Sequence, residues 1–130
     1  MSQDAITPEV AGTIPALFRE RLKRSPDKIA YQQYNFANKR WESSSWNEIA
    51  TEVARWQAAL EKENLQPGER VALMLKNSRD WVVFDQAALG MGLVTVPLYV
   101  DDRPDNVAYI INNSNVKVLL VQDTQQWKCL

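Results

Sequence analysis

Hydrophobic residues change their spacing along the chain, and each spacing predicts one kind of element. We expect residues 1–12 to form a polar, mobile lead-in. From Thr13, whose side chain can cap a helix, apolar residues recur every three or four positions until residues 25–27 interrupt the pattern. The apolar positions are Ile14, Leu17, Phe18 and Leu22. They predict a helix with one buried face.

Two short strands are predicted next. Residues 29–34 and 40–44 have the length and composition of strands, and residues 35–39 between them can form the loop of a hairpin. This loop contains no glycine, the residue most often found in tight hairpin turns. The sequence therefore predicts a β-hairpin without the usual turn residue.

The strongest helix signal begins at Ser45. Ser45 and Glu48 have the spacing of a capping box, in which each side chain satisfies one free backbone N–H at the helix start. Apolar residues follow at helical steps, and Pro67 and Gly68 end the element. The apolar positions are Ile49, Val53, Trp56 and Leu60. The pattern predicts a long amphipathic helix over residues 46–64.

Apolar runs and helix-like stretches alternate from residue 70 to residue 121. The predicted elements are a strand at 70–75, a helix from Ser78 to about Met91, a strand at 94–98, a helix of about ten residues from Pro104 and a strand at 117–121. Such units form parallel sheets, which are covered on both faces. The helix from Ser78 is apolar almost all round and is expected between layers. The fold class is therefore α/β: a three-layer, mostly parallel sheet with helices on both faces, plus an N-terminal β-hairpin.

The last residues look like the start of another helix. Asp123 can cap it, Gln126 lies at the capping-box position, and Trp127 and Leu130 are spaced as on one helix face. Isolated helices shorter than about 12 residues are marginal, and a last strand without a completed crossover leaves a sheet edge uncovered. We interpret the chain as truncated. A natural C-terminal helical turn is the alternative.

Composition narrows the class of protein. The 130 residues suit one domain, and 45% of them are hydrophobic. Fifteen Lys and Arg against 16 Asp and Glu give a net charge of −1, without a basic block that would favour nucleic acid. The N-terminus has no signal-peptide pattern, and the longest mostly apolar run, 87–100, is shorter than the about 20 residues that span a bilayer. Cys129 is the only cysteine, so no intrachain disulfide is possible. We expect a cytoplasmic protein without a transmembrane segment.

Missing residue types also limit the chemistry. The chain has no histidine, so it contains no Ser-His-Asp triad, Cys-His pair or His-ligated metal. Its glycines are too scattered for a loop that cradles phosphates. They are Gly12, Gly68, Gly90 and Gly92.

Two polar clusters are candidate sites. The first is residues 76–79 (Lys-Asn-Ser-Arg), between a strand and a helix, where open α/β sheets often bind ligands and where the helix dipole favours anions. Because no glycine lets the backbone approach a pyrophosphate, we favour a capped, solvated turn. The second cluster is Asp101, Asp102 and Asp105, with Arg103 among them. Paired carboxylates can bind Mg²⁺, but here we favour the stabilisation of a helix start.

The tryptophans and the cysteine are weaker candidates. Trp56 and Trp81 lie on apolar helix faces and are expected in the core. Three others can be exposed, but nothing orders them into a stacking platform: Trp41, Trp46 and Trp127. Lys128 can lower the pKa of Cys129 slightly, yet a near-terminal thiol without a base in the chain is expected to be inert.

Several stretches together carry a resemblance to a known family. The main ones are residues 77–82 (NSRDWV), 94–99 (VTVPLY) and 108–113 (AYIINN). Further matching positions are Trp41, Glu42, Ser45, Trp46, Ile49 and residues 67–72 (PGERVA). The pattern resembles the N-terminal region of acyl-CoA synthetases, in the adenylate-forming (AMP-binding) superfamily, over about residues 13–123. Residues 79–81 and 96–99 most resemble long-chain fatty acyl-CoA synthetases.

The resemblance implies that residues 13–130 are the first part of a large N-terminal domain, truncated at its C-terminal end. Enzymes of this family use ATP, Mg²⁺ and CoA to convert a fatty acid into acyl-CoA through an acyl-adenylate, releasing AMP and pyrophosphate. Their phosphate loop and catalytic motifs lie further along than Leu130. The resemblance therefore assigns no catalytic, cofactor-binding or metal-binding residue to this chain, and the fragment itself is expected to be inactive and to bind none of these cofactors. The parent would be cytoplasmic, with a peripheral membrane association left open.

Two other hypotheses about the function of the chain remain. The chain can be a freestanding doubly wound nucleotide-binding module, although it lacks the glycine loop of such modules. It can also be a non-catalytic interaction module that uses its apolar helices and open sheet edge. If the chain is a fragment, its open sheet edge and the apolar helix from Ser78 would lack their usual neighbours. This hypothesis predicts self-association of the isolated chain.

Overall fold

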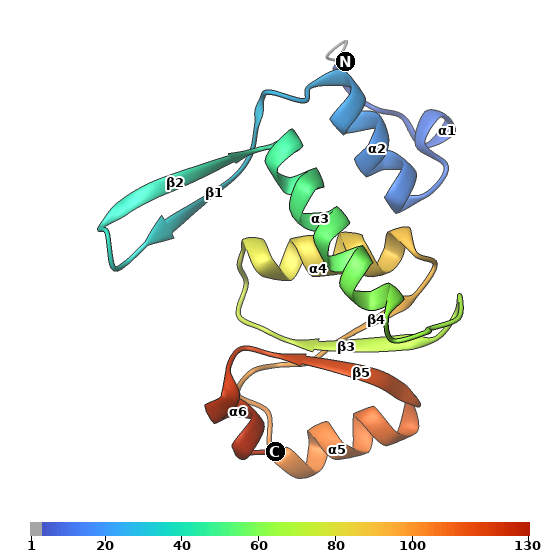
Figure 1. Cartoon of the computed structure of the whole chain (residues 1–130), viewed down its shortest axis with the longest axis vertical. Helices are drawn as coiled ribbons and strands as arrows, with labels where there is room; N and C mark the ends of the chain where they lie inside the picture. Colours follow the sequence, from blue (N-terminus) through green and yellow to red (C-terminus); the bar gives the residue numbers. More distant parts are fainter. Residues whose placement is uncertain (1–3) are drawn as a thin grey trace.

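The computed structural model of the chain describes residues 4–130 (Figure 1). Its elements, in chain order, are α1 (Pro8–Ala11), α2 (Ile14–Arg24), β1 (Ile29–Asn35), β2 (Arg40–Ser45), α3 (Trp46–Glu61), β3 (Arg70–Met74), α4 (Arg79–Gly90), β4 (Val94–Pro97), α5 (Pro104–Asn113), β5 (Val116–Val121) and α6 (Thr124–Lys128). Figure 1 shows α2, α3 and α4 on one side of a three-stranded sheet, and α5 and α6 on the other. The β1–β2 hairpin projects away from the sheet. The predicted α/β architecture is confirmed.

The three-stranded sheet is parallel, with the strand order β4-β3-β5. Side chains alternate between the two faces of a strand, so β3 serves both faces. Val71 and Leu73 pack with α3 and α4, whereas Ala72 and Met74 pack with Val107 of α5. All four β3 residues are buried. This central position explains why β3 is apolar without interruption after its first residue.

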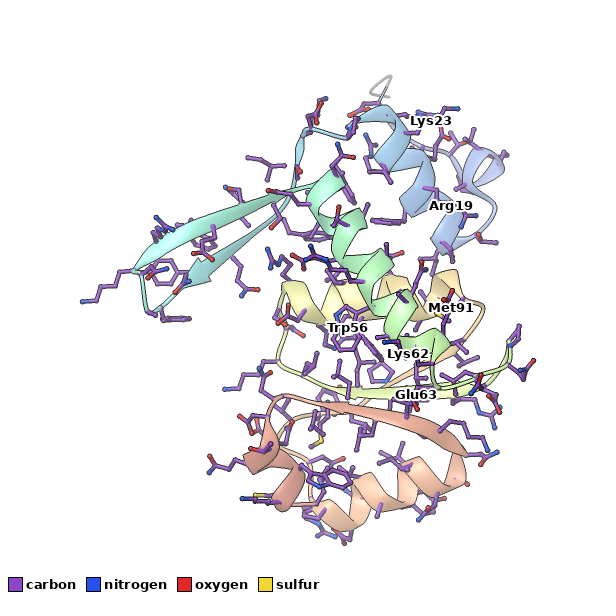
Figure 2. All side chains as sticks on the ribbon, in the orientation of Figure 1. Arg19, Lys23, Trp56, Lys62, Glu63 and Met91 are labelled. Carbon is purple, nitrogen blue, oxygen red and sulfur yellow. The ribbon has the colours of Figure 1, made fainter. Side chains whose placement is uncertain are left out.

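Helix α4 lies between the sheet and the helices α2 and α3, as its apolar sequence predicts. The Ser78 hydroxyl accepts a hydrogen bond from the backbone N–H of Trp81 (3.3 Å) and caps the helix. Phe84 is buried toward the sheet, and Val83 is buried against α3. Trp56 reaches from α3 into the same region (Figure 2). Its ring meets the Phe84 ring edge-on, with ring centres 5.2 Å apart.

The predicted capping box of α3 is present. The Ser45 hydroxyl accepts from the backbone N–H of Glu48 (3.2 Å), and the Glu48 carboxylate accepts from the backbone N–H of Ser45 (2.7 Å). The helix ends at Glu61, earlier than the predicted residue 64. Asn64 has a positive φ of 52°, which a right-handed helix does not allow, so the chain has already turned toward β3 there.

The N-terminal segment contains an element that the sequence analysis does not predict. A four-residue helix, α1, lies within the expected lead-in. Pro8 suits the first helical position, and Gly12, with a φ of 71°, suits the residue after the helix. The predicted helix from residue 13 is confirmed as α2, and the Thr13 hydroxyl accepts from the backbone N–H of Ala16 (3.2 Å). The mobility of residues 1–12 stays a prediction.

The apolar face of α2 is only partly covered, which corrects the prediction of a buried face. Phe18 and Leu22 are half-buried, but the exposed fraction is 58% for Ile14 and 41% for Leu17. Periodicity identifies the face that can be buried, whereas burial also requires something to pack against it. Arg19 and Lys23 lie on the exposed side of α2 (Figure 2).

The hairpin forms as predicted, although its loop contains no glycine. Strands β1 and β2 pair antiparallel, with Asn35 opposite Arg40. Lys39 takes the left-handed conformation (φ 50°) that glycine often supplies in such turns. The Asn35 side chain accepts from the backbone N–H of Asn38 (3.0 Å), and this local side-chain hydrogen bond stabilises the loop.

The helix start predicted at the end of the chain is confirmed as α6. The Asp123 carboxylate accepts from the backbone N–H of Gln126 (2.8 Å). The Gln126 side chain accepts from Gln122 (2.8 Å), one residue earlier than a capping box requires.

Candidate functional site

The carboxyl ends of the three parallel strands form the first candidate site. The chain passes from β3 to β4 and then crosses to β5 on the other side of β3. Connections of opposite direction leave a crevice at this edge, where open α/β sheets bind ligands. A hollow of about 330 Å³ occurs there. Its lining includes Lys76, Asp101, Gln122, Asp123, Gln126 and Cys129.

A wider groove of about 590 Å³ adjoins this hollow. Both share Lys76, Val100 and Asp101, so the predicted loop after β3 does face a cavity. Trp81 and Tyr99 line the wider groove, and the exposed fraction of Tyr99 is 85%. The wider groove thus combines one cation, one carboxylate and two aromatic rings.

Arg79 does not point its charge into this groove. Its guanidinium pairs with Glu52 of α3 (3.0 Å) and donates to the Ser44 hydroxyl of β2 (2.8 Å). Its backbone N–H donates to the Gln33 side chain of β1 (2.7 Å). Arg79 therefore joins the hairpin and α3 to the start of α4, and the interpretation of residues 76–79 as a capped turn is supported.

The acidic cluster does not form a metal site. Asp102 accepts from the backbone N–H of Arg103 (2.8 Å) and from the Asn106 side chain (3.0 Å). The Arg103 guanidinium donates to both carboxylate oxygens of Asp105 and holds the pKa of Asp105 below its ordinary value. Within residues 4–130, no group of Asp, Glu, Cys or His side chains has an arrangement that could hold a metal ion.

Helix-start chemistry explains the cluster only in part. Asp105 lies in the first turn of α5, as predicted. The residue that precedes the helix is Arg103, however, and its side chain caps no backbone N–H. Asp102 and Asp105 therefore bind neighbouring side chains and nearby backbone N–H groups, including those in the first turn of α5.

The aromatic and cysteine predictions have mixed outcomes. Trp56 and Trp81 pack against the core while staying partly exposed. Trp41 and Trp127 are exposed, whereas Trp46 is half-buried between Phe18 and Tyr31. Cys129 is an exposed free thiol.

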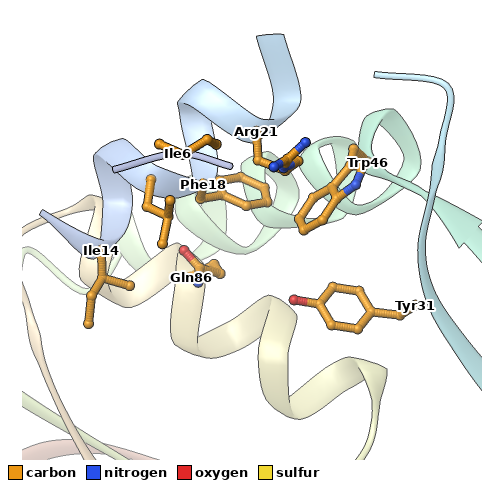
Figure 3. A pocket seen from close by; sticks show the side chains of 8 residues that line it. Ile6, Ile14, Phe18, Arg21, Tyr31, Trp46 and Gln86 are labelled. Atoms are coloured by element: carbon orange, nitrogen blue, oxygen red, sulfur yellow. The ribbon is translucent and has the colours of Figure 1, made fainter. Parts of the chain in front are cut away.

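A second hollow, not predicted from the sequence, lies between α2, α4, β1 and the start of α3 (Figure 3). Its volume is about 270 Å³, and its lining includes Phe18, Arg21, Tyr31, Trp46 and Gln86. Burial raises the pKa of the Tyr31 hydroxyl. The Oε1 atom of Gln86 is buried and has no hydrogen-bond partner among residues 4–130. No sequence motif marks this site, because its residues meet only through the packing of distant elements.

The described residues do not fit ATP with Mg²⁺. A nucleotide site of this kind needs carboxylates for the metal and a backbone that approaches the phosphates closely. Residues 4–130 provide no metal-binding group, the loop after β3 has no glycine, and Arg79 is engaged elsewhere. We therefore place no nucleotide on these residues.

The chain is similar to known proteins along most of its length. A family model described as AMP-binding enzyme matches residues 18–129. Tyrocidine synthase 1 of Brevibacillus parabrevis is 30% identical over 123 residues, which are 94% of this chain and 11% of that protein. Long-chain-fatty-acid--CoA ligase ACSBG2 of Rattus norvegicus is 30% identical over 118 residues, 91% of this chain and 17% of that protein.

The fold of the chain is also similar to that of solved structures. The fatty acyl-adenylate ligase from L. pneumophila, solved in complex with acyl adenylate and pyrophosphate, superposes with a TM-score of 0.80 at 21% identity. The match covers 95% of this chain and 22% of that chain. The chain thus spans less than a fifth of the two curated relatives and about a fifth of the solved one.

Proposed function

We propose, because the chain belongs to the AMP-binding enzyme family, that it forms the first part of a long-chain-fatty-acid–CoA ligase. The parent would use ATP, Mg²⁺ and CoA to convert a fatty acid into acyl-CoA through an acyl-adenylate. Membership in the AMP-binding enzyme family supports the proposal that the parent forms an adenylate. The fatty acid part is supported by the relative named a long-chain-fatty-acid--CoA ligase and by residues 79–81 and 96–99.

Within the parent, residues 13–130 would act as scaffold. The βαβαβ unit holds a buried parallel strand, β3, between helices on both sides. The residues that would contact ATP, Mg²⁺ and CoA belong to other parts of the parent, in keeping with the poor fit of these groups to residues 4–130. We also propose a cytoplasmic location. Among the residues that the structure describes, no helix is both long and apolar enough to cross a membrane.

A second candidate is favoured by the match to tyrocidine synthase 1, which covers 94% of this chain at 30% identity. Under this alternative, the parent would activate an acid other than a fatty acid with the same adenylation chemistry. The fold does not separate the two, because one scaffold can serve related enzymes with different substrates.

ATP–pyrophosphate exchange tests the proposal directly. In the full-length parent, we expect exchange that depends on palmitate and is much slower with acetate or benzoate. Equal rates with palmitate and acetate would contradict the long-chain assignment, and exchange with benzoate alone would favour the second candidate. The 130-residue chain by itself should show no palmitate-dependent exchange, since the proposal places the residues that contact ATP in other parts of the parent. Exchange by this chain alone would contradict the scaffold role.

A further inference from the structure

The hollow in Figure 3 continues into an apolar surface groove. The neighbouring groove, of about 360 Å³, is formed by α1 and the start of α2. The two share Ile6, Ile14 and Leu17, so together they form one trough, which we call the α2 trough. Its outer end is almost wholly apolar, and its inner end is polar. The polar residues of the inner end are Arg21, Tyr31 and Gln86.

The inner end lacks hydrogen-bond partners that a bound molecule can supply. Gln86 Oε1 is buried and unpaired among residues 4–130, and leaving a buried acceptor unpaired is costly. The structure gives the Tyr31 hydroxyl no protein partner within the same residues, and Figure 3 shows it directed toward the side on which Gln86 lies. One neutral group that both donates and accepts a hydrogen bond would satisfy both side chains.

The cation at this end, Arg21, already has partners of its own. The Arg21 guanidinium donates to the Asp4 carboxylate (2.8 Å), to the Asp4 carbonyl (2.6 Å) and to the Ser25 hydroxyl (2.9 Å). The hydrogen bond from Arg21 keeps the pKa of Asp4 below its ordinary value, so the pair stays ionised at neutral pH. A carboxylate ligand would have to compete with Asp4 for Arg21, whereas an uncharged ligand would not.

We propose that the α2 trough binds an uncharged amphiphile: an aliphatic chain that ends in a hydroxyl group. The hydroxyl donates to Gln86 Oε1 and accepts from the Tyr31 hydroxyl. The chain covers Ile14 and Leu17, whose apolar surfaces are exposed in the free protein. Burying this surface drives binding, and the hydroxyl fixes the orientation. This site is independent of the proposed adenylation activity.

Octan-1-ol is the probe, and chemical shifts of the ¹⁵N-labelled chain are the readout. We expect saturable shifts at the backbone N–H groups of Ile14 and Gln86 and at the indole N–H of Trp46. Methyl octanoate, which cannot donate a hydrogen bond, and octanoate, which is charged, should each bind more weakly than octan-1-ol. Tighter binding of octanoate would contradict the uncharged head group. Shifts that do not saturate, or that centre on Lys76 and Tyr99, would overturn the site.

Two variants test the two ends of the trough separately. Gln86→Leu removes the acceptor while keeping the volume, and it should weaken octan-1-ol binding about fivefold or more without harming the fold. Ile14→Ser shortens the apolar lining and should also weaken binding. Val10→Ser is the matched control, because Val10 is similarly exposed (55%) but lines neither part of the trough. Unchanged affinity in Gln86→Leu, or equal losses in the two serine variants, would contradict the proposal.

Discussion

The two faces of the parallel sheet are covered to different depths. On one face, α4 packs on β3 and is itself covered by α2 and α3, so two layers of buried side chains form. On the other face, α5 provides Val107 as its only fully buried residue, and six neighbouring apolar residues stay partly exposed. These are Val96, Val100, Ile110, Ile111, Val116 and Leu119. The comparison shows that one strand can be equally buried on both sides while the layers beyond it differ.

The difference has a consequence for stability. A side chain enclosed on all sides leaves a cavity when it is shortened, because the surrounding structure relaxes only in part. Next to an open layer, neighbouring side chains can move into the space. Mutations on the doubly covered face should therefore cost more than equal mutations on the face of α5.

The largest effect is expected from Phe84→Ala. Phe84 is 1% exposed and packs with Leu73 of the sheet and edge-on against Trp56. Its truncation should lower the free energy of unfolding by about 3–5 kcal/mol, measured by urea denaturation. Tyr109→Ala on α5 removes an aromatic ring that is 69% exposed. This substitution should change the free energy of unfolding by less than about 0.5 kcal/mol. Similar losses in both variants would show that burial of the ring does not set the cost of its truncation in this fold.

A matched pair of identical substitutions sharpens the comparison. Val83 is fully buried in the outer layer between α4 and α3, and Val107 is 1% exposed on α5. Each Val→Ala change loses about 1.6 kcal/mol of transfer free energy at about 0.8 kcal/mol per methylene. We expect Val83→Ala to cost more than Val107→Ala in the same urea experiment, because partly exposed neighbours of Val107 can move into the space that its truncation leaves. The opposite order would mean that the α5 layer is the more rigid one.

The sequence predicts elements well where the decisive contacts are local. The caps at Ser45, Ser78 and Asp123 each join residues three positions apart, so the pattern alone identifies them. The alternation of strands and helices also predicts the parallel sheet, because few topologies suit it.

Contacts between distant residues could not be predicted in this way. The Arg79 partners Ser44 and Gln33 lie 35 and 46 positions away in the sequence. The exposure of Ile14 and Leu17 depends on what packs against α2, and the pocket around Gln86 depends on how α4 meets β1. A single sequence shows which face of a helix or strand is apolar, but it does not show which distant element packs against that face.

The two edge strands of the sheet, β5 and β4, also differ. We propose that the isolated chain self-associates through β5. This strand is an edge of the three-stranded sheet, and unpaired edges favour pairing with another chain. The opposite edge, β4, is shorter and contains Pro97, which cannot donate a ladder hydrogen bond. β5 is apolar except for Lys117, and charged residues on edge strands oppose such pairing.

The smallest expected effect is that of Lys117→Val. Lys117 is exposed, so its loss should leave the fold intact while removing the one charge that protects the β5 edge. Sedimentation velocity across a dilution series should show dimers or larger species at micromolar concentration for the unaltered chain. In Lys117→Val the association should shift to lower concentration by a few-fold, in line with the about 0.2–1 kcal/mol of a cross-strand pair. Lys23→Val makes the same charge change on the exposed side of α2, away from β5 (Figure 2), and should leave the association unchanged. A monomer at every concentration would show that α5 and α6 protect this edge sufficiently, and an equal shift in both variants would attribute the effect to net charge instead of the strand edge.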